Sequence, residues 1–228
     1  MSKLTKLIIL IILSLSVYFI YNITMNSKYK IINLGDKLSL GYNSYGIKEA
    51  SYIDYYKDYL LKEKKEVEII NEYSKENQSI KNILYTIKNT SSIKKDLLDS
   101  NILIITLGYN DLLYDLSLEE NKNPYSLNKI ISDIKTDYND LIKEISKYYH
   151  KDIIVIGYYK SNKNDYYINQ GIIRLNQLLK SNKNIYYINT YDLINNPKYF
   201  NNPDSYYPNI QAYQLISKKI ISKTLEIS

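Results

Sequence analysis

The chain consists of short, continuous apolar runs separated by longer segments in which apolar residues recur at helical spacing. Continuous apolar runs are typical of strands that are buried on both faces of a sheet. The clearest run reads NILIITL and ends just before a glycine. The runs predict five buried strands, over residues 31–34, 67–73, 101–107, 152–158 and 184–189.

The segments between these runs have the spacing of amphipathic helices. In the longest of them, Ile130, Ile134, Tyr138 and Leu141 fall on one helical face. The same pattern predicts helices over residues 51–65, 79–88, 93–98, 126–149, 166–181 and 208–225. Strands that alternate with helices favour a parallel sheet covered on both sides. We therefore predict an α/β fold, a three-layer α/β/α sandwich with a five-stranded parallel sheet.

The N-terminal region differs from the rest because residues 7–27 carry no charged side chain. A helix of that length spans about 31 Å, which matches one hydrocarbon core. Lys3 and Lys6 precede the apolar stretch, and the positive-inside rule keeps such a terminus in the cytoplasm. We therefore predict a transmembrane signal anchor over 1–27, in contact with the membrane through 7–27. A single extracytoplasmic domain over 28–228 would follow, attached to the cell membrane by this single pass.

Two other interpretations of the N-terminal stretch are less consistent with the sequence. A cleavable signal peptide would end in a small-residue exit, which is not visible, and a lipobox would need a cysteine, which the chain lacks. A buried core helix is less consistent because the stretch is terminal, apolar all round and flanked by lysines on both sides.

Composition removes several classes of function. The chain has no cysteine and one histidine, which excludes thiol chemistry, disulfides and multi-histidine metal sites. The net charge of +6 is spread over interspersed lysines, with Arg174 as the only arginine, so we expect no nucleic-acid partner. The 28 tyrosines, against 2 phenylalanines and no tryptophan, are typical of an AT-rich bacterial genome, and they take over core packing.

Three polar segments lie where ligands bind in parallel α/β sheets, beyond the carboxyl ends of the strands. Residues 35–38 read GDKL after the first strand, and residues 108–111 read GYND after the third. Residues 204–208 read DSYYP before the last helix. In this order the segments resemble the G-D-S-L, G-x-N-D and D-x-x-H-P blocks of the SGNH/GDSL hydrolases, over about residues 30–225.

This resemblance implies a flavodoxin-like SGNH fold and is closest to the bacterial lysophospholipase-like esterases that carry an N-terminal anchor. It places Lys37 at the position of the nucleophilic serine and Tyr207 at that of the histidine base. It also implies Asn110 as an oxyanion donor and Asp204 as the acid. The family's second block supplies a glycine for the oxyanion, but residues 71–77 contain none.

The two replacements remove the reactive groups of the family mechanism. A lysine amine has an ordinary pKa of about 10.4 and a tyrosine of about 10, so neither replaces a serine hydroxyl activated by an imidazole. We therefore predict a protein that is inactive as a serine esterase and acts as a cell-envelope binding or interaction module, with a lipid or glycan ligand. The alternative is an active ester hydrolase with a rearranged site. We expect no cofactor and no metal.

Several local roles remain open at this site. Lys37 could form an ion pair with Asp204 that seals the old site, or act with Asn110 to hold an anionic group, or serve as a desolvated nucleophile. Asn110 could instead stabilise its turn. Ser39 lies two residues past Lys37 but lacks a base. His150, the only imidazole, falls at the end of a helix on the opposite edge of the sheet.

Overall fold

The computed structural model describes residues 3–25, 28–63, 66–160, 165–181, 185–202 and 207–227. Its sheet has five strands: β1 (Tyr29–Gly35), β2 (Val67–Ile70), β3 (Ile102–Thr106), β4 (Ile153–Ile156) and β5 (Ile185–Ile188). All neighbours pair in parallel, in the order β2-β1-β3-β4-β5. The predicted five-stranded parallel sheet is confirmed.

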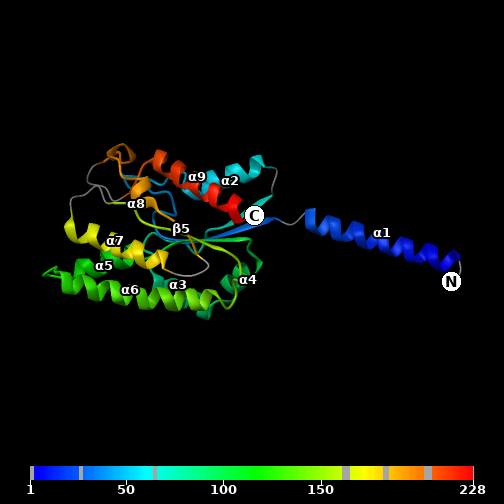
Figure 1. Ribbon diagram of the computed structural model, residues 1–228, viewed down its shortest axis with the longest axis horizontal. Coiled ribbons are helices and arrows are strands. Elements are labelled where there is room, and N and C mark those ends of the chain that lie inside the picture. Colours follow the sequence, from blue (N-terminus) through cyan, green and yellow to red (C-terminus); the bar gives the residue numbers. More distant parts are fainter. Residues whose placement is uncertain are drawn as a thin grey trace.

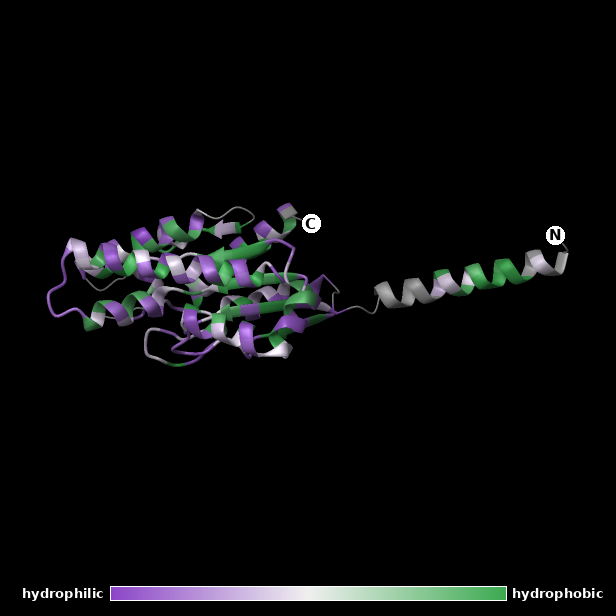
Figure 2. Cartoon of the chain, turned by 90° about the horizontal axis from the view of Figure 1, so that it is seen from below, coloured by the Kyte–Doolittle hydropathy of each residue, from purple (hydrophilic) through white to green (hydrophobic). Residues whose placement is uncertain are grey.

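The central strands form the core of the domain. Every residue of β3 and β4 is buried, which explains why their sequences are unbroken apolar runs. Figure 2 shows these apolar strands between helices whose outer faces are more polar. Because all strands run in one direction, their carboxyl ends meet at one edge of the sheet, called the carboxyl edge below.

Helices cover both faces of the sheet. One layer contains α2 (Tyr52–Lys62), α8 (Thr190–Leu193) and α9 (Ile210–Ile227), and the other contains α3 (Ile80–Asn89), α4 (Ser91–Asp99), α5 (Tyr109–Leu118), α6 (Pro124–Ile145) and α7 (Tyr166–Lys180) (Figure 1). A short 3-10 helix, η1, covers Pro197–Tyr199. These layers confirm the predicted α/β/α sandwich.

Helix starts follow from local capping. Ser51 and Asn123 each accept backbone N–H groups at the first turns of α2 and α6, and both form capping boxes. The side chain of Ser79 caps α3 in the same way.

Some boundaries and elements differ from those predicted. Strand β2 ends at Ile70, three residues early, because the chain turns there, with the Ser74 backbone N–H donating to the carbonyl oxygen of Asn71 at 3.1 Å. Helix α6 ends at Ile145 rather than at residue 149. Helices α5 and α8 and the 3-10 helix η1 were not predicted.

The predicted transmembrane segment forms helix α1 (Lys3–Met25), which stands apart from the sheet in Figure 1. Within the described part of the chain, no helix is long and apolar enough to cross a membrane, so the structure does not support the transmembrane prediction. The large apolar side chains described in α1, from Ile8 to Tyr18, are exposed.

Candidate functional site

The first site segment leaves the sheet at Gly35 and folds back tightly. A Cβ added at Gly35 would lie 2.5 Å from the Cβ of Ser39, so only glycine fits this approach. Ser39 is fully buried, and its hydroxyl donates to the carbonyl oxygen of Asp36 at 2.7 Å. The Ser39 hydroxyl is therefore part of the turn and does not face the cleft.

Asp36 lies beneath this turn as a buried carboxyl group. It accepts hydrogen bonds from the Leu38 backbone N–H and the Tyr158 hydroxyl, each at 3.0 Å. Burial raises the pKa of Asp36 to about 7, although both hydrogen bonds favour the charged form and lower it. Sequence reasoning missed this pair, because Tyr158 lies far away in the chain, beyond the end of β4.

Lys37, at the nucleophile position, is held on several sides. Its Nζ lies 3.4 Å from Oε2 of Glu76, and 5.4 Å and 5.7 Å from the ring centroids of Tyr42 and Tyr207. Both ring distances are within the range of cation–π attraction. An ion pair with Asp204 was one of the predicted possibilities, but Asp204 lies outside the described residues, and the carboxylate that contacts Lys37 is Glu76.

Glu76 is itself fixed by a second partner. The Tyr42 hydroxyl donates to Oε1 of Glu76. This hydrogen bond, followed by the contacts with Lys37, lowers the pKa of the Glu76 carboxyl, so the group is anionic at neutral pH. Glu76 belongs to the segment in which we sought the family's second block, but no local sequence pattern identifies it as a partner of Lys37.

Asn110 lies in the first turn of α5, two residues after Gly108. Gly108 has a φ of 114°, and a Cβ there would approach Leu175 to 3.1 Å, which accounts for glycine at this strand–helix junction. The Asn110 side-chain amide donates to the carbonyl oxygens of Glu76 and Gln78, at 3.0 and 3.1 Å. Both of its amide hydrogens thus bind the loop that carries Glu76.

Asp111 caps a helix, although not its own. Its carboxylate accepts the backbone N–H of Ile80, at the start of α3, at 3.2 and 3.3 Å. Burial raises the pKa of Asp111 to about 6, with the backbone hydrogen bonds acting in the opposite direction.

Tyr207 and His150 occupy opposite edges of the sheet. Tyr207 is partly buried beside Lys37, and its carbonyl oxygen accepts the Ser44 hydroxyl at 2.6 Å. Burial raises the pKa of the Tyr207 phenol above its ordinary value, which leaves even less phenolate to act as a base near neutral pH. His150 is exposed between α6 and the start of β4, as predicted for a residue far from the carboxyl edge.

The structure therefore brings Lys37, Asn110 and Tyr207 to the carboxyl edge, with Glu76 between the first two. A cavity of about 530 Å³ opens beside Asn110 and Tyr207. Within the described residues, no group of three or more histidine, aspartate or glutamate side chains could hold a metal ion.

A family model described as GDSL-like Lipase/Acylhydrolase matches residues 31–220. The chain belongs to this family, as its motifs predicted. It is similar in structure to the lipase Lip_vut3 from a goat rumen metagenome, with 21% identity, a TM-score of 0.73, and coverage of 86% of this chain and 97% of that chain.

Two further esterase structures share the fold. A catalytic mutant of the acetylxylan esterase Axe2 from Geobacillus stearothermophilus has 16% identity and a TM-score of 0.66, covering 86% of this chain and 94% of that chain. The esterase EstA from Pseudoalteromonas sp. has 18% identity and a TM-score of 0.59, covering 87% of this chain and 100% of that chain. The comparison with curated proteins gives no match.

Proposed function

We propose that this member of the GDSL-like family has lost serine-esterase activity and acts as a ligand-binding module of the cell envelope. The observation that carries the proposal is the state of Lys37. An ammonium group held between a carboxylate and two tyrosine rings occupies the nucleophile position, and an ammonium has no lone pair with which to attack an ester.

The other groups of the site support the same proposal. Tyr207 offers no base near neutral pH, and the nearest serine along the chain, Ser39, is buried with its hydroxyl already donating. The oxyanion donor expected at Asn110 has both amide hydrogens on backbone carbonyls. Nucleophile, base and oxyanion positions thus all have side chains committed to other contacts.

We further propose that α1 attaches the domain to the cell membrane, with the domain on the outer side. The exposed apolar side chains of α1, and Lys3 and Lys6 before its apolar stretch, support this proposal. Helix α1 ends at Met25 and β1 begins at Tyr29, so α1 joins the domain at the amino edge of the sheet. The candidate site at the carboxyl edge then faces away from the membrane, toward envelope lipids or glycans outside it.

The loss of esterase activity is tested by hydrolysis of p-nitrophenyl acetate with the purified full-length chain. We expect a rate no higher than that of the heat-unfolded chain in the same buffer, both for the unaltered chain and for the Lys37→Met variant. Turnover by the folded chain well above that of the unfolded chain would overturn the proposal.

Membrane attachment is tested separately by washing membranes with alkaline carbonate. The full-length chain is expected in the pellet, and the Leu10→Asp/Leu13→Asp variant is expected to be released because two charges interrupt the apolar surface of α1. Release of the unaltered chain would contradict attachment through α1.

A further inference from the structure

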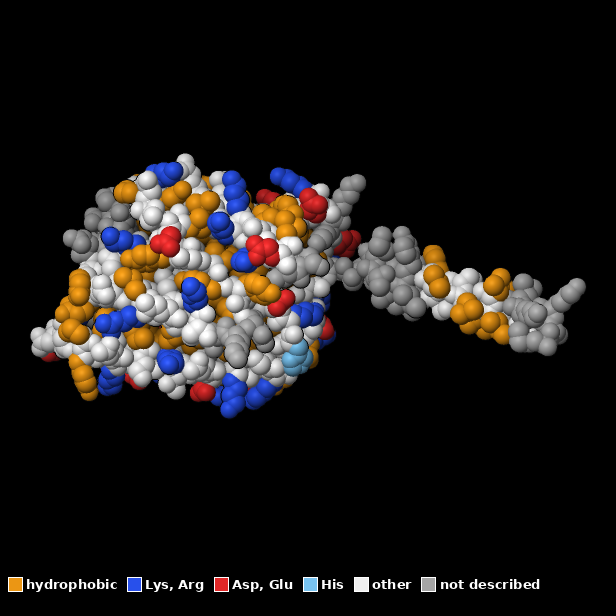
Figure 3. Space-filling model, viewed as in Figure 1, with side chains coloured by type: hydrophobic (Ala, Val, Ile, Leu, Met, Phe, Trp, Pro, Cys, Tyr) orange, Lys and Arg blue, Asp and Glu red, His pale blue; other side chains and the backbone are white. Residues whose placement is uncertain are grey.

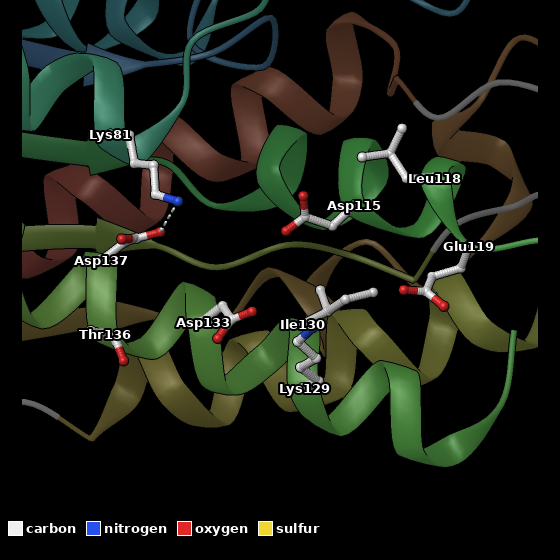
Figure 4. Close-up of a pocket in the computed structure, with 9 residues that line it drawn as sticks. All are labelled: Lys81, Asp115, Leu118, Glu119, Lys129, Ile130, Asp133, Thr136 and Asp137. Atoms are coloured by element: carbon white, nitrogen blue, oxygen red, sulfur yellow. Dashed lines mark ion pairs between the residues drawn. The ribbon is translucent and has the colours of Figure 1, made fainter.

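A second feature of the carboxyl edge extends away from Lys37. The cavity beside Asn110 and Tyr207 adjoins another of about 380 Å³, and both are lined by Lys81, Asp115 and Asp137. Together they form a groove between α3, α5 and α6, called the acidic groove here. Figure 4 shows its outer half, where Asp115 and Glu119 on the α5 side face Asp133 on α6.

The groove is strongly negative in a chain whose net charge is positive. It contains the carboxylates of Asp111, Asp115, Glu119, Asp133 and Asp137. Two lysines accompany them, and one of these, Lys81, forms an ion pair with Asp137 at 3.4 Å. Five carboxylates and two ammonium groups leave three negative charges, against +6 for the whole chain.

The carboxylates of the groove repel one another. The pKa of Asp115 is raised, first by burial and then by the charges of Asp133, Asp137 and Glu119, while Lys81 acts in the opposite direction. In the part of the chain that the structure describes, no ion pair holds Asp115, Glu119 or Asp133. A cationic ligand in the groove would relieve this repulsion.

The rest of the lining is neither charged nor uniformly apolar. Tyr114 and Leu118 are exposed at the rim, at 65% and 63% of their surface. Uncharged polar side chains from Asn77, Ser79 and Thr136 also line the groove. Such a surface offers a flat apolar contact, hydrogen-bond partners for hydroxyls, and carboxylates for amines.

We propose that the acidic groove binds an oligomer of amino sugars with free amino groups. The sugar ring faces would lie against Tyr114 and Leu118, the hydroxyls would reach the uncharged polar side chains, and the ammonium groups would pair with Asp115, Glu119 and Asp133. The proposal rests on the proposed function and names the ligand class of that binding module. A linear polyamine would satisfy the carboxylates but leave the ring-facing and hydroxyl-facing surface unused.

The geometry also favours an extended ligand. The inner cavity reaches Asn110 and Tyr207, and the outer cavity reaches Glu119 and Lys129, so the groove leads from the family site out along α5 and α6. Exposed apolar side chains are visible at the end of the domain opposite α1 (Figure 3). A polymer outside the membrane would meet this end of the domain.

The test is isothermal titration of the full-length chain in detergent with three probes: glucosamine hexamer, N-acetylglucosamine hexamer and spermine. We expect the glucosamine hexamer to bind at least about tenfold more tightly than either of the others, with affinity falling as salt rises. Equal binding of the acetylated hexamer would show that the carboxylates do not contribute to binding. Equal binding of spermine would show that binding depends on charge alone and not on the sugar rings. Either result, or no binding, overturns the proposal.

A matched pair of variants locates the site. Glu119→Gln/Asp133→Asn removes two groove charges and should weaken binding of the glucosamine hexamer about tenfold, whereas Asp140→Asn, an exposed carboxylate of α6 outside the groove, should leave it unchanged. Equal loss in both would contradict the assignment. None of these probes is an ester, so esterase activity would defeat the proposed function without affecting this result.

Discussion

The surroundings of Lys37 and the acidic groove differ in how their charged groups are compensated. At the Lys37 end, charged and polar groups are paired with one another: the ammonium with Glu76, the Asn110 amide with backbone carbonyls, and Asp36 with Tyr158. In the acidic groove, about 10 Å of helix further along α5, carboxylates face each other with few counter-charges.

This difference indicates which charged groups stabilise the fold and which are available to bind a ligand. Polar groups that satisfy one another stabilise the fold and have little left for a ligand. Groups that repel one another cost stability and are retained where a partner supplies the missing charge. Under the two proposals made above, the family's catalytic position is part of the scaffold and the adjoining groove is the part of the cleft that binds a ligand.

The largest predicted effect concerns the buried carboxyls beneath the site. The pKa values of Asp36 and Asp111 are raised to about 7 and about 6, above the ordinary value near 3.9 of an unfolded chain. Between the unfolded-state pKa and the raised folded-state pKa of each group, the folded protein binds more protons than the unfolded one. The free energy of unfolding should therefore fall as pH rises from about 4 to about 7. Each group contributes a slope of at most about 1.4 kcal/mol per pH unit.

Urea unfolding between pH 4 and 8 measures this effect. Asp36→Asn should flatten the fall between pH 6 and 7, where Asp111 contributes little, and should about halve its slope below pH 6, where both groups contribute. A stability that rises across this window in the unaltered chain would contradict the assigned burial of Asp36.

Next in size is the effect of the Asn110 amide on the Glu76 loop. Asn110→Ala removes two hydrogen bonds and should lower the free energy of unfolding by about 1 to 3 kcal/mol. Backbone amides of residues 75–78 should then exchange hydrogen faster. Asn77→Ala, in the same loop, is the control and should change stability by less than about 0.5 kcal/mol. Equal stability of Asn110→Ala and the unaltered chain would favour a free oxyanion donor instead.

The sequence predicted most of the fold for a physical reason. Strands buried on both faces leave unbroken apolar runs, so all five were found. Two of the predicted helices begin at Ser51 and Ser79, which the structure shows to be the caps of α2 and α3. The end of β2 was misplaced because the backbone turns between Asn71 and Ser74, where no glycine or proline marks a turn. Helix α5 was missed because its first residues belong to the GYND motif, which we interpreted as a strand-end loop.

The site was predicted only as far as its motifs extend. Lys37, Asn110 and Tyr207 were located by their place after strands and before the last helix. The role of Glu76 depends on the path of its loop, which is set by hydrogen bonds from Lys75 N–H to Gly35 and from Asn110 to the loop carbonyls. Such long-range contacts leave no periodic signal in a single sequence.

The smallest predicted effect comes from a substitution in the acidic groove, and it increases stability, whereas Asn110→Ala decreases it. Asp133→Asn removes one of the mutually repelling charges and should raise the free energy of unfolding by a few tenths of a kcal/mol at low salt, and by less at high salt. Lys81→Met should lower it by a similar amount because a compensating charge is lost. If Asp133→Asn destabilises the protein instead, the groove carboxylates belong to the scaffold, as the groups around Lys37 do.

The central claim is that no serine of this chain is an activated nucleophile. It is tested most directly by intact mass spectrometry of the full-length protein after treatment with a fluorophosphonate, with an active serine esterase treated in parallel. We predict that the chain keeps its unmodified mass while the esterase gains one adduct. A stoichiometric adduct on this protein, above all on Ser39, would contradict the account.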